Sequence, residues 1–205
     1  MTPRPLSLAL VVAFSFATLA MSPCAHAYDK KAFIAPEGKA LIVFVQNQRV
    51  DRKMVYTVFE SDKRCVAEVG GREAQVLPVE PMPLLLYALG YNTTYRIEIY
   101  PQAGRTYFVR LHTVDKPMGA APEVTLVRRA TEEHKLLKFH LEGVAVLPVI
   151  GNDTCYGKPL NERKNRTQRR LNEGNAEWKN GDDLFRDRYT LIEKDGLTRA
   201  DIELF

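Results

Sequence analysis

The sequence predicts a mainly β protein, an antiparallel β-sandwich of about seven strands with a C-terminal α-helical extension. Three observations lead to this prediction. Apolar and polar residues alternate on both sides of a Pro/Gly turn within residues 94–114, TYRIEIYPQAGRTYFVRLHTV. Other short runs rich in Val, Ile, Tyr and Phe follow at close spacing, without long helical patterns between them. Beyond Gly151, apolar residues recur instead at helical spacing.

Residues 1–27 have the pattern of an export signal. Arg4 is their only charge, and an uncharged apolar run covers residues 8–21. The segment ends in Ala-His-Ala, which places small residues at the two positions that a signal peptidase reads. We therefore expect cleavage after Ala27 and a periplasmic or secreted protein.

Two other interpretations of this segment are available. A transmembrane anchor needs roughly 20 apolar residues, and the run is shorter than that. Lipid attachment at Cys24 is disfavoured by Pro23 directly before it. No second long apolar stretch follows, so the mature chain is expected to have no transmembrane helix.

The first predicted strands lie between residues 40 and 80. Residues 40–46, ALIVFVQ, form an almost continuous apolar run, typical of a central strand that is buried on both faces. Residues 54–60 and 64–69 follow as strands separated by turn residues. In the next strand, residues 74–80, Pro78 lacks an amide donor, so this strand is expected at a sheet edge or to end early.

The second half of the predicted sandwich contains its clearest signal. Residues 95–99 and 107–111 alternate apolar and polar around the turn at 101–104, which predicts a hairpin with one buried face. Residues 84–89 are apolar and fit either a short strand or one helical turn. A final strand is expected over residues 123–129.

The domain organisation follows from these patterns. We expect a β-sandwich domain over residues 28–150, with Thr131 capping a short amphipathic helix near its end. Residues 151–183 are polar and basic, so they are expected as a linker or an exposed helix. Residues 184–205 are expected as one amphipathic C-terminal helix, or as two, docking on the sandwich or on a partner.

Cys65 and Cys155 remain after the export signal is removed. An even number of cysteines in an oxidising compartment favours a disulfide between them. Such a bridge closes a loop of about 90 residues and contributes at most roughly 4–5 kcal/mol in the chain-entropy model, a figure that strain in the folded protein often reduces. The alternative is two separate buried thiols.

Three segments resemble the DUF2846 proteins, a bacterial envelope family of unknown function. EGKALIVFV at residues 37–45 resembles the opening strand of that family, and AGRTYFVRL at 103–111 resembles its Gly-Lys/Arg-Thr-Tyr strand. EVTLVRRATEEHKLLK at 123–138 resembles its closing strand and short acidic helix. The resemblance covers about residues 37–138. It implies an envelope β-sandwich of the transthyretin-like or carboxypeptidase-regulatory-like kind, and it brings no catalytic residues.

The sequence contains no residue pattern typical of catalysis or metal binding. His112, His134 and His140 lack ligand spacing and are expected to be solvated. There is no Gly-x-Ser-x-Gly motif and no Cys-x-x-Cys pair. We therefore expect neither an enzyme nor a bound cofactor or metal ion.

The segment RKNRTQRR at residues 163–170 is the most functional-looking polar feature. It is a candidate contact for an anionic surface, such as lipid headgroups or an acidic partner, and the alternative is a solvated linker. It lacks interleaved aromatic residues, so nucleic acid is not an expected partner. The candidate contact residues are Arg163, Lys164, Arg166, Arg169 and Arg170.

These observations predict an exported, non-catalytic interaction or accessory module of the bacterial cell envelope. Its partner is expected to be a protein or another envelope component, docking on edge strand 74–80 or on an apolar helical face. That face consists of Leu184, Phe185, Tyr189 and Ile192.

The alternative is a periplasmic small-ligand or carbohydrate-binding protein, because tyrosines gather around the predicted central hairpin. These are Tyr87, Tyr91, Tyr95, Tyr100 and Tyr107.

Overall fold

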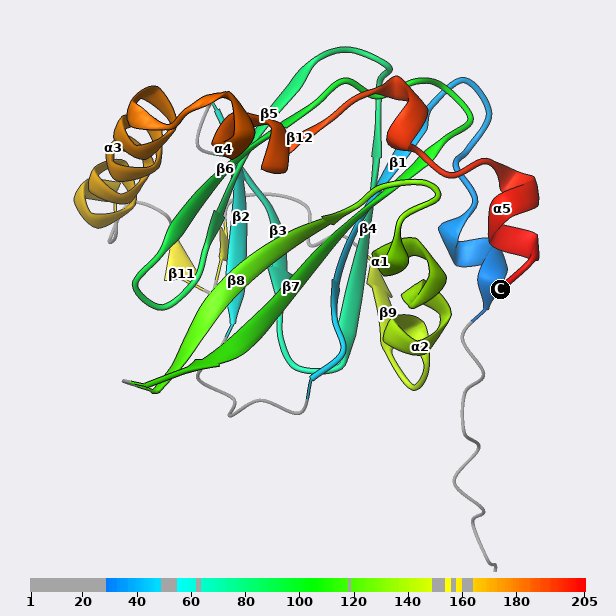
Figure 1. The fold of residues 1–205 in the computed structure, drawn as a ribbon, viewed down its shortest axis with the longest axis horizontal. Helices are drawn as coiled ribbons and strands as arrows, with labels where there is room; N and C mark the ends of the chain where they lie inside the picture. Colours follow the sequence, from blue (N-terminus) through cyan, green and yellow to red (C-terminus); the bar gives the residue numbers. More distant parts are fainter. Residues whose placement is uncertain are drawn as a thin grey trace, which may run out of the picture.

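The computed structural model describes residues 29–48, 55–61, 64–117, 119–148, 154–155, 158–159 and 164–205. The expected export signal lies outside the described residues. The described chain forms two five-stranded sheets with helices around them (Figure 1). The prediction of a mainly β fold with C-terminal helices is confirmed, and the strands outnumber the seven or so expected from the sequence.

Both sheets are mixed rather than purely antiparallel, since β1–β7, β4–β9 and β6–β12 pair in parallel. The first sheet has the order β8 (Gly119–Val127), β7 (Thr106–Lys116), β1 (Ala40–Gln46), β4 (Glu73–Val79), β9 (Ala145–Pro148). The second sheet has the order β12 (Thr190–Leu191), β6 (Thr94–Ile99), β5 (Leu84–Leu89), β2 (Tyr56–Glu60), β3 (Cys65–Val69). A separate two-stranded pair consists of β10 (Thr154–Cys155) and β11 (Lys158–Pro159).

Strand β1 is buried on both faces, as its sequence predicted. Its Ile42 and Phe44 pack in the core between the two sheets, together with side chains from β2, β5 and β6. Leu41 and Val43 pack in a second core on the opposite face of the first sheet. Short helices cover that face, which explains why nearly every residue of this strand is apolar.

The predicted hairpin of residues 95–111 is wrong in its pairing, although both halves are strands. Strand β6 pairs with β5 in the second sheet, whereas β7 pairs with β1 and β8 in the first. The turn carries the chain from one sheet to the other, and Gly104 in it adopts a φ of +76°. Alternation marks the buried face of a strand but does not identify its neighbour.

Strand β4 is not a sheet edge over its first half, because β9 pairs with it from Glu73 to Val76. Pro78 lies beyond the last β9 pair, so its missing amide hydrogen removes no bond to β9. The edge prediction is therefore correct only for the end of the strand. Residues 84–89, for which the sequence left two options, form strand β5 in the interior of the second sheet.

The C-terminal residues 182–205 form a belt that contacts both sheets (Figure 1). After α4 (Asp183–Arg188), β12 pairs with β6 in the second sheet. The chain continues through η3 (Glu193–Asp195), and Leu197 then exchanges backbone hydrogen bonds with Thr106 of β7. Helix α5 (Arg199–Glu203) completes the belt beside η1 (Lys30–Phe33). These residues thus form two short α-helices, with strand β12 and the 3-10 helix η3 between them. The sequence left one or two helices open, and it did not predict the strand.

Candidate functional site

Helices α1 (Glu132–Lys135) and α2 (Leu137–Leu141) form a small raised platform on the outer face of the first sheet. We refer to residues 131–141 as the platform. Thr131 caps α1, as its sequence predicted, by accepting a hydrogen bond from the His134 backbone amide. Leu137 and Leu141 anchor α2 in the second core. This leaves the opposite side of each helix turned toward solvent.

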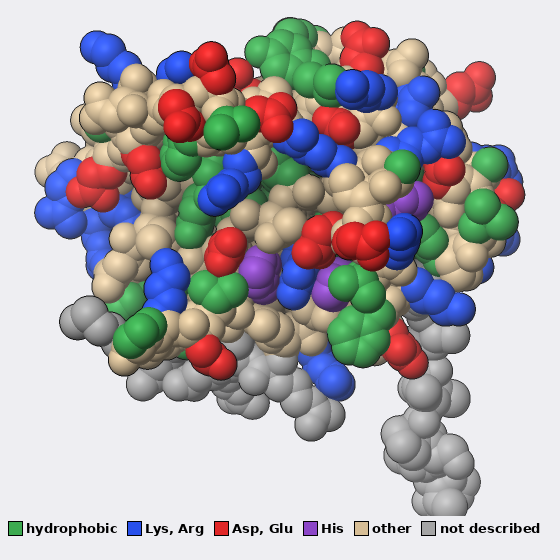
Figure 2. Space-filling view, viewed as in Figure 1, with side chains coloured by type: hydrophobic (Ala, Val, Ile, Leu, Met, Phe, Trp, Pro, Cys, Tyr) green, Lys and Arg blue, Asp and Glu red, His purple; other side chains and the backbone are tan. Residues whose placement is uncertain are grey.

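Two large apolar side chains of the platform face solvent. Leu136 is 48% exposed and Phe139 is 65% exposed. Lys135 and Lys138, which are also exposed, alternate with them along the chain. On the face seen in Figure 2, apolar side chains project beside histidine, basic and acidic ones. Large apolar groups that the fold leaves uncovered beside polar ones are typical of a binding surface.

A polar group lies between the platform and β7, and we call it the Arg110 cluster. Its members are Arg110 and His112 of β7, Asn47 after β1, Glu133 of α1 and His140 of α2. One carboxylate oxygen of Glu133, Oε2, lies 3.3 Å from Arg110 Nη1 and 3.5 Å from His140 Nε2. On the other side of the imidazole ring, Asn47 Nδ2 lies 3.0 Å from His140 Nδ1.

His112 and His140 are buried, being only 7% and 5% exposed, so the expectation that they are solvated is wrong. Burial lowers the pKa of both rings below the ordinary histidine value, and the Arg110 guanidinium lowers it further. Both are therefore neutral at pH 7. The alternation did place His112 on the outward side of its strand, but the sequence did not reveal that helices cover that side.

Three buried side-chain atoms of the Arg110 cluster have no hydrogen-bond partner among the described residues. They are Arg110 Nε, His140 Nε2 and Asn47 Oδ1. His140 Nε2 lies 3.5 Å from Glu133 Oε2, which is within ion-pair distance but long for a hydrogen bond. Because a buried polar atom without a partner is costly, such a concentration at one place indicates an incompletely filled site.

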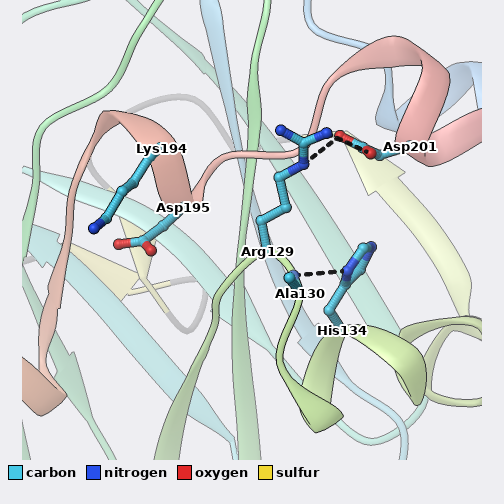
Figure 3. A pocket seen from close by; sticks show the side chains of 6 residues that line it. All are labelled: Arg129, Ala130, His134, Lys194, Asp195 and Asp201. Carbon is cyan, nitrogen blue, oxygen red and sulfur yellow. Dashed lines mark hydrogen bonds and ion pairs between the residues drawn. The ribbon is translucent and has the colours of Figure 1, made fainter.

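A second feature borders the platform, an open cavity of about 450 Å³ (Figure 3). Arg129 binds Asp201 through two contacts of 3.1 Å, and the Ala130 amide donates to His134 Nδ1 at 3.2 Å. The first pair joins the loop before α1 to α5, and the second joins this loop to α1, while the side chains from η3 lie on the other side of the cavity (Figure 3). The lining residues are Arg129, Ala130, His134, Lys194, Asp195 and Asp201.

Much of the polar lining of this cavity is already engaged in contacts within the protein. Partial burial acts to raise the pKa of Asp201, but hydrogen bonds from Thr198 and Arg129 outweigh it, and the pKa lies below its ordinary value. Asp195 accepts the Ile192 amide at 2.9 Å. The cavity therefore offers fewer unsatisfied groups than the Arg110 cluster does.

The basic residues predicted to contact an anionic surface do not share the same surroundings in the structure. Arg163 and the side chain of Lys164 lie outside the described residues. Arg166 and Arg169 are exposed on α3 (Lys164–Asn180), and Arg169 forms an ion pair with Glu173. A role of these two in binding an anionic surface remains a prediction.

Arg170 cannot take part in that contact, so its inclusion was wrong. It is buried, and its guanidinium donates to the Gly90 and Tyr91 carbonyl oxygens at 3.2 and 3.1 Å, and also to the Thr93 carbonyl. Its Nε lies 3.0 Å from Thr94 Oγ1. Arg170 therefore binds the β5–β6 turn and holds α3 against the second sheet.

The predicted apolar docking face does not exist as one surface. Phe185 and Tyr189 pack against the core between the sheets, with ring centroids 5.2 Å apart. Leu184 and Ile192 are exposed. The four residues share a helical spacing in sequence, but Tyr189 and Ile192 lie outside α4, so that spacing is not maintained in space.

The five tyrosines do not line a common pocket in the described part of the chain. Tyr87 and Tyr107 are buried, whereas Tyr91 and Tyr100 are exposed. The hydroxyl of Tyr95 donates to the Pro122 carbonyl at 2.7 Å. Their position near one turn in sequence reflects packing in and around the sandwich.

The two cysteines lie on neighbouring elements. Cys65 begins β3, and β10, which ends with Cys155, lies beside that strand. The side chain of Cys155 lies outside the described residues. The disulfide remains a prediction, which this neighbourhood supports.

The chain has little similarity to known proteins. No family model and no curated protein matches the chain. Among solved structures, the C-terminal domain of AlgF from P. aeruginosa is similar over 44% of this chain and 99% of its own, with 16% identity and a TM-score of 0.29.

Two features are absent from the described residues. These residues contain no helix long and apolar enough to cross a membrane. They also contain no group of three or more His, Cys, Asp and Glu side chains placed to hold a metal ion.

Proposed function

We propose that the protein is an exported, non-catalytic β-sandwich that serves as an interaction module of the bacterial cell envelope and docks a protein partner on the platform. The observation that carries the proposal is the exposure of Leu136 and Phe139 on helices that are firmly attached to the sandwich. Burial of each of these side chains by a partner makes the free energy of binding more favourable, by up to about 1.5–3 kcal/mol for full burial.

The attachment of the platform supports this role. Helices of four or five residues do not persist alone in water. Here the Thr131 cap and the buried Leu137 and Leu141 hold them in place. A surface that is ordered before binding loses little conformational entropy when a partner arrives.

Export and the envelope location rest on the sequence. They are supported by the apolar segment within residues 1–27 and by the resemblance of residues 37–138 to an envelope family. The two docking surfaces first expected are replaced, because β4 is paired on both sides at its start and the Leu184–Ile192 face is divided.

The test is a crosslinking pull-down from envelope extract of the native host, comparing three forms of the protein. The double variant Leu136→Ser/Phe139→Ser removes the exposed apolar pair, and Leu184→Ser removes an equally apolar residue that is 80% exposed on α4. We expect a protein that is captured by the native form and by the Leu184 variant, and lost from the double variant. Equal capture by all three forms would contradict docking on the platform.

A second candidate is the binding of a polar small ligand, which the cavity of about 450 Å³ favours. Lys194 and the free edge of His134 would contact such a ligand. Thermal unfolding in the presence of a panel of monosaccharides and amino acids tests it. A shift that Lys194→Gln abolishes supports this function, and unchanged unfolding across the panel removes it.

A further inference from the structure

We infer that the Arg110 cluster is a recognition site for a carboxylate of the docked partner, and that Glu133 occupies this site in the free protein. The inference rests on the proposed docking at the platform and names the chemistry that the partner presents there: an Asp or Glu side chain next to an apolar residue.

The first step concerns Arg110. A guanidinium normally binds a carboxylate through two parallel hydrogen bonds, one to each oxygen. Here Glu133 offers a single oxygen, at 3.3 Å from Nη1, and Arg110 Nε is left buried without a partner. The carboxylate that is present therefore uses only part of what Arg110 can donate.

The second step concerns His140. Asn47 Nδ2 faces its Nδ1 at 3.0 Å, so Nδ1 accepts and the ring proton lies on Nε2. His140 Nε2 lies 3.5 Å from the Glu133 oxygen that Arg110 Nη1 also contacts, and it forms no hydrogen bond of normal geometry. One donor on β7 and one on α2 thus approach the same carboxylate oxygen, and both contacts are long.

The third step concerns Glu133, which is able to leave. Its side chain is 34% exposed, and it belongs to a helix of only four residues. Solvent replaces its two long contacts readily, whereas Arg110 and His140 are fixed on a central strand and a buried helix face. A carboxylate of the partner that reaches both donors with good geometry therefore binds Arg110 and His140 more strongly than Glu133 does.

The charges around the site favour an anion once Glu133 has moved. Arg110 and Glu133 are the charged groups that face His140, and Glu123 also faces His112 from β8. Displacement of Glu133 leaves the Arg110 charge without its carboxylate partner in a half-buried position. A buried, unpaired guanidinium is unfavourable and is relieved by the incoming carboxylate.

The residues around the Arg110 cluster favour a ligand that has apolar groups beside its carboxylate over a free anion. The ring of Phe139 lies against that of His140, with centroids 5.8 Å apart, so an exposed apolar surface borders the donors. A partner segment in which an acidic residue lies between apolar ones matches both features. The platform then supplies apolar contact, and Arg110 with His140 sets the position of the segment.

The experiment titrates the purified full chain with the peptide Ac-Phe-Glu-Leu-NH2 and, separately, with Ac-Phe-Gln-Leu-NH2, and measures affinity by calorimetry. Glu133→Gln frees the site, and we expect it to bind the glutamate peptide at least about tenfold more tightly than the native chain. Glu132→Gln is the matched control on the same helix and leaves binding unchanged. Addition of Arg110→Gln to the Glu133→Gln variant abolishes the gain.

Three results overturn the inference: no gain with Glu133→Gln, equal affinity for the two peptides, or a gain that survives Arg110→Gln. The His140 ring nitrogen resonances of the native chain provide a measurement that needs no variant, since the glutamate peptide is expected to shift them at high concentration and the glutamine peptide is not. Equal capture of a protein by all three forms in the pull-down, with peptide binding intact, removes the docking proposal alone. Capture that only the double variant loses, without any binding of the glutamate peptide, removes the carboxylate site and leaves docking in place.

Discussion

Nε of Arg170 lies 3.0 Å from Oγ1 of Thr94, which joins the middle of α3 to the first residue of β6. The same guanidinium binds carbonyl oxygens of the β5–β6 turn. A residue in the most basic stretch of the sequence is thus part of the interior.

Replacement of Arg170 by Ala is expected to destabilise the protein by about 2–4 kcal/mol, because it leaves several buried acceptors without donors. Urea unfolding followed by circular dichroism measures the change. Arg169→Ala is the control, since that side chain is exposed and forms only a surface ion pair; its effect is expected within about 0.5 kcal/mol. Equal effects of the two substitutions would contradict the structural role of Arg170.

Stability is expected to fall as the pH decreases below about 6.5. His112 and His140 have pKa values below this ordinary value in the folded protein, so the unfolded chain binds more protons as the pH passes below it. The stabilisation is complete above the unfolded pKa and is lost as the pH falls toward the folded pKa. Urea midpoints measured between pH 7.5 and pH 5 test this, and the double variant His112→Gln/His140→Gln should show a flatter profile. A native profile as flat as that of the variant would count against the burial of these rings.

The predicted bridge between Cys65 and Cys155 is expected to leave no free thiol in the denatured, non-reduced mature chain. Titration with a thiol reagent in guanidinium chloride counts them, and two thiols per chain would rule out the bridge. If the bridge is present, Cys65→Ser lowers the free energy of unfolding by about 2–4 kcal/mol. The same substitution measured in reducing buffer is the control and should have a much smaller effect.

Gly174 permits the close approach of α3 to the second sheet. A Cβ atom at this position would lie 2.9 Å from Thr94 Cγ2. Replacement of a helical glycine by alanine normally stabilises by about 1 kcal/mol, but here we expect Gly174→Ala to destabilise by about 1–2 kcal/mol because of overpacking. Asn172→Ala on the exposed side of α3 is the comparison and should be neutral or stabilising. A gain in stability with Gly174→Ala would show that α3 is free to move away.

The sequence was sufficient for features that depend on a single element. The apolar run of residues 40–46 predicted a central strand, and Thr131 predicted a helix cap, because burial and capping leave a mark on consecutive residues. Pairing between elements leaves no such mark. Strands β6 and β7 alternate as a hairpin would, yet the turn between them crosses from one sheet to the other.

The candidate site was missed for the same reason. Arg110 and His112 occupy polar positions of β7, which a single sequence indicates as solvent-facing. Their burial depends on helices that follow more than twenty residues later and on Asn47 at the end of β1. The sequence contains only a weak signal for this site. Residues 131–141 contain Glu133, His140 and more apolar residues than one buried face needs, Leu136 and Phe139 among them.

The belt affects how the two sheets unfold. It is hydrogen-bonded to β6 in one layer and to β7 in the other, so neither layer separates from its neighbour while those bonds last. Heating should therefore give one heat-absorption peak, with both layers melting together. A single protease cut within η3, between the segment bonded to β6 and the segment bonded to β7, would remove this link between the two layers.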